Sequence, residues 1–197
     1  MIHTPKQKRI LLSILIILLG IFAVYGFYRP EKTDNYFMLQ DDVTPPTGMP
    51  DQLNIVSGIV YRHLVAYNLV CTESGQPLNK YPVYFSNKYK AEIRQIDEAW
   101  AHRGKSLESV LTDYDSHRYP KIAPTIQTEL LDLERQMALM IKAQKANIHP
   151  NQVKWTVEDE NKLNLKDACV LFDDVAPEIG EKTKFADIFR QFMRNIK

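Results

Sequence analysis

Glycine is scarce in this chain, with 7 among 197 residues. Outside the apolar run near the N-terminus, the glycines are Gly48, Gly58, Gly75, Gly104 and Gly180. Folds built from β-strands need many tight turns, and tight turns often require glycine. The scarcity therefore argues against a turn-rich β architecture and favours helices joined by short turns.

Motifs for common catalytic chemistry are also absent. The chain has no His-Glu-x-x-His pair for zinc, no Cys-x-x-Cys-His site for covalent haem, no Gly-x-Ser-x-Gly elbow and no glycine-rich phosphate loop. Catalytic groups can assemble from distant residues, so this absence alone does not exclude an enzyme. The sequence favours a non-enzymatic role, and we expect no cofactor.

No excess of positive charge is present either. The 25 Lys and Arg residues nearly balance the 24 Asp and Glu residues, which leaves a formal net charge of +1. A domain that binds nucleic acid needs a basic face to meet the phosphates. We therefore expect no nucleic-acid partner.

The longest apolar run begins at Ile10 and ends at Tyr28, and Lys6, Lys8 and Arg9 precede it. An α-helix of this length spans about 28 Å, close to the hydrocarbon thickness of a bilayer. We predict an uncleaved transmembrane signal anchor, and a cleaved secretory signal peptide is the alternative. The basic residues before the run predict that the N-terminus is cytoplasmic.

These features divide the chain into a basic cytoplasmic tail (1–9), a transmembrane segment (10–28), a linker with several prolines (29–49) and an all-α extracytoplasmic domain (50–197). The expected location is the inner or cytoplasmic membrane, with a single pass. Apolar residues at helical spacing predict a bundle-like domain of five or six helices. The expected helices cover residues 50–71, 86–103, 106–114, 124–147, 156–174 and 183 onward. Residues 76–87 are expected to be irregular, with a short extended piece near Pro82.

Two of these helices have apolar faces that allow more than one interpretation. In the helix over 124–147, five residues follow the a/d spacing of a coiled coil: Ile126, Leu130, Leu133, Met137 and Met140. We predict that they face the domain core, and a seam for a partner or a second copy is the alternative. The helix from 183 is expected to pack on the core, and docking to a partner or a membrane surface is the alternative.

The two cysteines, Cys71 and Cys169, both lie in the predicted extracytoplasmic domain. An even pair in an oxidising compartment predicts a disulfide. Each cysteine also lies on the apolar face of a predicted helix, so two buried free thiols are the alternative.

Aromatic residues gather in the first half of the predicted domain. Such rings usually fill cores, but a clustered set can line a ligand groove. Tyr61, Tyr67, Tyr89 and Trp100 are therefore candidates for an apolar pocket between helices.

The most suggestive polar cluster contains Asp113, Asp115 and His117. Alternate residues in a loop can converge, and carboxylates with an imidazole bind divalent metals. Asp and His are also ordinary loop and capping residues, and the sequence offers no second half of such a site.

The combined expectation is a membrane-tethered, non-enzymatic helical factor that binds or assembles a protein partner outside the cytoplasm. One alternative is a ligand-binding protein that uses the aromatic residues. The other is a metal-dependent enzyme that uses Asp113, Asp115 and His117.

Overall fold

A computed structural model describes residues 52–179 together with Phe185, Phe189 and Arg190. Every regular element within these residues is helical, which confirms the predicted all-α class. The described part of the chain contains seven α-helices rather than five or six, when the continuous stretch 52–73 is counted as one. The predicted cytoplasmic tail (1–9), the predicted transmembrane segment (10–28) and the predicted linker (29–49) lie outside the described residues.

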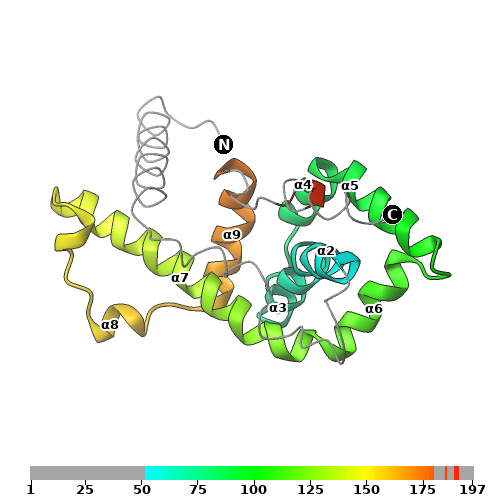
Figure 1. Cartoon of the computed structure of the whole chain (residues 1–197). Coiled ribbons are helices and arrows are strands. Elements are labelled where there is room, and N and C mark those ends of the chain that lie inside the picture. Colours follow the sequence, from blue (N-terminus) through cyan, green and yellow to red (C-terminus); the bar gives the residue numbers. More distant parts are fainter. Residues whose placement is uncertain (1–51, 180–184, 186–188, 191–197) are drawn as a thin grey trace. The chain divides into compact units, whose positions relative to one another are not determined.

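The most buried element is one continuous helix, made of α2 (Gln52–Tyr61), the π-helical turn η2 (Arg62–Ala66) and α3 (Tyr67–Glu73). We call it the central helix. Its α2 part contacts α5 and α6, and its α3 part contacts α7 and α9 (Figure 1). Neighbours on several sides explain why it is apolar around most of its circumference.

Among the described residues, the central helix is the one that is long and apolar enough to cross a membrane. However, 67% of its apolar window is buried inside the structure, as expected for a core helix. The central helix ends at Glu73, and Gly75 follows with a φ of +82°. This left-handed backbone conformation, which glycine adopts without strain, turns the chain away from the helix.

The expectation of an irregular segment over residues 76–87 is confirmed for 76–80 and is wrong from Tyr81 onward. Residues Tyr81–Lys88 form α4, and α5 (Lys90–Ala101) follows after a break at Tyr89. Pro82 lies in the first turn of α4, where a missing backbone N–H costs nothing. The predicted helix over 86–103 is therefore two helices, because the backbone of Tyr89 (φ −110°, ψ 25°) leaves the helical region.

The next two helices are α6 (Leu107–His117) and α7 (Tyr119–Ala146). The hydroxyl of Ser106 accepts a hydrogen bond from the backbone N–H of Ser109, so α6 begins where the sequence predicts. The predicted start of α7 at Pro124 is wrong, because Pro120 occupies the first turn and Pro124 lies inside the helix. Asn147, with a φ of 52°, ends α7 in the left-handed conformation.

The predicted helix over 156–174 is divided into α8 (Val157–Glu160) and α9 (Leu165–Ile179), and the short 3₁₀ turn η3 (Pro150–Gln152) precedes them. Thr156 and Asp159 form a reciprocal capping pair at the start of α8, where the sequence predicts a helix to begin. Asn164 accepts a hydrogen bond from the backbone N–H of Asp167 at 2.9 Å and so starts a new helix. Pro177 lies within α9, so the helix continues beyond its predicted end at residue 174.

The core fills the space between the central helix and the helices around it. Phe185 and Phe189, which are the described apolar residues beyond α9, are buried in this core. The ring centroid of Phe185 lies 4.9 Å from that of Tyr89 and 5.8 Å from that of Phe85. At these two positions the chain packs on its own domain, as predicted for the helix from 183, whose other residues lie mostly outside the described part.

Candidate functional site

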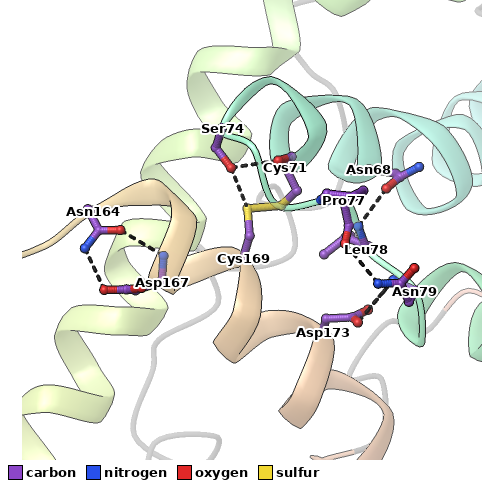
Figure 2. Close-up of a disulfide and its surroundings, with 10 residues drawn as sticks. All are labelled: Asn68, Cys71, Ser74, Pro77, Leu78, Asn79, Asn164, Asp167, Cys169 and Asp173. Carbon is purple, nitrogen blue, oxygen red and sulfur yellow. Dashed lines mark hydrogen bonds between the residues drawn. A yellow bond between two sulfur atoms is a disulfide. The ribbon is translucent and has the colours of Figure 1, made fainter.

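A disulfide between Cys71 and Cys169 joins the end of the central helix to α9 (Figure 2). The two Cα atoms are 5.7 Å apart, and both residues are fully buried. The hydroxyl of Ser74 lies 3.7 Å from the sulfur of Cys169 and donates a hydrogen bond to the backbone oxygen of Cys71. Of the two alternatives for the cysteines, the structure contains the bonded pair and no free thiol among its described residues.

A second connection ties α9 to the N-terminus of α4. The carboxylate of Asp173 accepts hydrogen bonds from the backbone N–H groups of Asn79, Lys80 and Tyr81, at distances between 2.9 and 3.2 Å. Figure 2 shows Asp173 one turn along α9 from the disulfide. A carboxylate at a helix N-terminus satisfies donors that have no partner within the helix and also meets the positive end of the helix dipole. Asp173 therefore acts as a cap supplied from a distant part of the sequence.

The π-helical turn carries charge into the apolar core. The guanidinium of Arg62 pairs with the carboxylate of Glu129 on α7, and the hydroxyl of Tyr67 donates to the same carboxylate at 2.7 Å. Arg62 also lies over the Tyr67 ring, 5.4 Å from its centroid. Burial alone would lower the pKa of Arg62, but its charged and hydrogen-bonded neighbours reverse the effect and raise it. The three residues form a polar cluster that joins the central helix to α7.

The next residue on the π turn, His63, is buried among aromatic rings. Its Nδ1 lies 2.6 Å from the hydroxyl of Tyr81, and its ring stacks on Phe85 at a centroid distance of 4.8 Å. Burial, together with the charge of Arg62, lowers the pKa of His63 to about 3. The imidazole is therefore neutral at ordinary pH and serves as a polar core residue.

Arg62, His63 and Glu129 are not among the candidate site residues that the sequence indicates. The available signal was a pair of polar residues, Arg62 and His63, within an otherwise apolar helical stretch. Such residues require buried partners, and π turns often occur at functional sites. Here the partners of the cluster are side chains of the same domain, so the cluster stabilises the fold.

The four aromatic pocket candidates are all buried, but they have different neighbours. Tyr61 donates a hydrogen bond to Asp115 at 2.7 Å, and this bond together with burial raises its pKa. Trp100 donates from its indole N–H to the hydroxyl of Ser57 at 2.9 Å. Tyr61 thus links α2 to α6, whereas Trp100 links α5 to α2.

The other two candidates pack elsewhere in the core. Tyr67 stacks on Phe172 of α9 at a centroid distance of 4.7 Å, and Tyr89 meets Phe185 edge to face. Each of the four rings thus fills its own part of the core. An apolar ligand pocket lined by these four rings stays a hypothesis, and no contact among the described residues supports it.

The three metal candidates lie in helix α6 and not in a loop as we expected. His117 pairs with Asp113 one helical turn away at 3.2 Å, whereas Asp115 points to Tyr61. Residues two positions apart in a helix face different directions, which separates Asp115 from the other pair. Within the described part of the chain, no three His, Cys, Asp or Glu side chains come together in a group that could hold a metal ion.

The C-terminal half of α7, residues 131–146, differs from the rest of the helix in its burial. In the first half, Ile126 and Leu130 lie in the core. In the C-terminal half, Ala143 is the single described residue that is fully buried. The expectation that the whole a/d series faces the core therefore fails beyond Leu130. The residues that form the distal face of α7 are half-buried or exposed: Leu133, Met137, Met140 and Ile141.

The flank of this half of α7 is held by charged residues from the segment 155–164. Arg135 pairs with Glu160, and Lys142 pairs with Asp159. Hydrogen bonds from Lys142 and Thr156 lower the pKa of Asp159 to about 2. These pairs use the charged flank of α7. Ile141 remains 43% exposed, and Ile148, just beyond the helix, remains 41% exposed.

No family model, no curated protein and no solved structure matches this chain.

Proposed function

We propose that this protein is a membrane-tethered, non-enzymatic interaction or assembly factor whose helical domain lies outside the cytoplasm and binds a protein partner. The observation that carries the proposal is the distal face of α7. Leu133, Met137 and Met140 are only partly buried, and Ile141 beside them is 43% exposed. An apolar stripe that stays partly open over several turns of a helix is a feature of surfaces that contact a partner. A helix of this kind offers apolar anchors at helical spacing to a partner.

The proposed location draws on two further features. The apolar run from Ile10 to Tyr28 is long enough to anchor the chain in a bilayer, and the basic residues before it favour a cytoplasmic N-terminus. The disulfide between Cys71 and Cys169 is typical of proteins that fold in an oxidising compartment. Both features support a single-pass protein of the inner or cytoplasmic membrane.

The polar groups with partners inside the domain support a binding role over a catalytic one. The Arg62–Glu129–Tyr67 cluster is held by pairing between the central helix and α7. Asp113 and His117 pair with each other on the exposed side of α6. In each case, partners within the domain account for the arrangement.

Site-specific photo-crosslinking in intact cells tests the proposed surface. A photoreactive residue is introduced at Ile141 in the full-length chain, and separately at Val83 of α4 as a matched control. Val83 is 58% exposed, so both positions are accessible and apolar. We expect a discrete protein adduct from position 141 and none from position 83. Recovery of an uncrosslinked monomer from both positions would overturn the proposal.

A pair of charge substitutions provides an independent test. Ile141→Glu places a carboxylate on the distal face, whereas Val83→Glu does the same on α4. Both side chains are exposed, so each change should alter the free energy of unfolding by less than about 0.5 kcal/mol. We expect I141E alone to reduce the amount of partner that co-purifies in mild detergent. Equal recovery with both variants would rule out the distal face as the contact.

A further inference from the structure

We draw no further inference here: the strongest candidate, the half-exposed apolar face on the C-terminal half of α7, belongs to the surface already described, and nothing in the described residues shows whether a second copy, another protein or a lipid surface covers it.

Discussion

Loss of the disulfide should destabilise the domain mainly through its unfolded state. Cys71 and Cys169 are separated by 98 positions, so the bond closes a long loop. In the chain-entropy model, a loop of this size contributes about 4.7 kcal/mol at 25 °C, and measured losses for native disulfides are typically about 2–5 kcal/mol. We therefore expect reduction to lower the free energy of unfolding by about 3–4 kcal/mol.

The structure limits how far the native state should change. Asp173 still caps α4 after reduction, and Phe172 still stacks on Tyr67. These contacts hold α9 in place without the sulfur–sulfur bond. The reduced protein should thus keep its helical circular dichroism spectrum at low urea concentration while its unfolding midpoint falls.

Urea unfolding of the full-length chain in mild detergent, with and without dithiothreitol, measures this effect. The dependence of the free energy on urea concentration should increase after reduction, because an uncrosslinked unfolded chain exposes more surface. A Cys71→Ala/Cys169→Ala variant, unaffected by the reductant, serves as the control. A loss below about 1 kcal/mol with an unchanged urea dependence would refute the argument from the unfolded state.

Three other predictions concern polar contacts. Asp173→Ala should lower stability by about 1–2 kcal/mol, because three backbone N–H groups at the N-terminal end of α4 lose their acceptor. Asp174→Ala removes an exposed ion pair and should cost less than about 0.5 kcal/mol, so urea unfolding distinguishes the two variants. Glu129→Leu should cost about 3 kcal/mol, because it leaves the buried Arg62 charge uncompensated, and adding Arg62→Met should restore part of the loss in a double-mutant cycle. The pKa of His63 in the folded state lies below its value in the unfolded state, so the folded state binds fewer protons. The free energy of unfolding should therefore fall as the pH drops from about 6.5 towards 3, by up to about 1.4 kcal/mol per pH unit. His63→Phe should flatten this dependence between pH 5 and 7, and an unchanged slope would contradict the assignment of the effect to His63.

The sequence predicts those helix boundaries that depend on local signals. Ser106 precedes α6 and caps it, and Thr156 with Asp159 caps α8. In both cases, donor and acceptor lie within three positions of each other, so the pattern contains the whole interaction. The disulfide is not local, since its cysteines are 98 positions apart, and it is predicted from their even number, with two free thiols as the alternative.

The helix α4 could not be predicted because its decisive contact is long-range. Pro82 indicates an interruption when only its neighbours are considered. In the structure, the carboxylate of Asp173, 92 positions from Tyr81, satisfies the N-terminal donors of α4. Pro82 in the first turn then removes a donor that needs no partner.

The polar cluster and the distal face of α7 show a similar limit. Arg62 and Glu129 are 67 positions apart, and no local pattern indicates that they meet. The a/d series of α7 continues unchanged beyond Leu130, but Leu133, Met137 and Met140 are only partly buried. Periodicity predicts which face of a helix is apolar, and the tertiary structure decides how much of that face is covered.

Native mass spectrometry of the full-length protein, extracted in mild detergent without reductant, tests the central claim most directly. The account predicts a chain that retains its N-terminal anchor, is lighter than the reduced chain by two hydrogens, and carries another polypeptide. A mass without the N-terminal segment would contradict the proposed tether, and two free thiols would contradict the disulfide. A bare monomer would contradict the proposed assembly role.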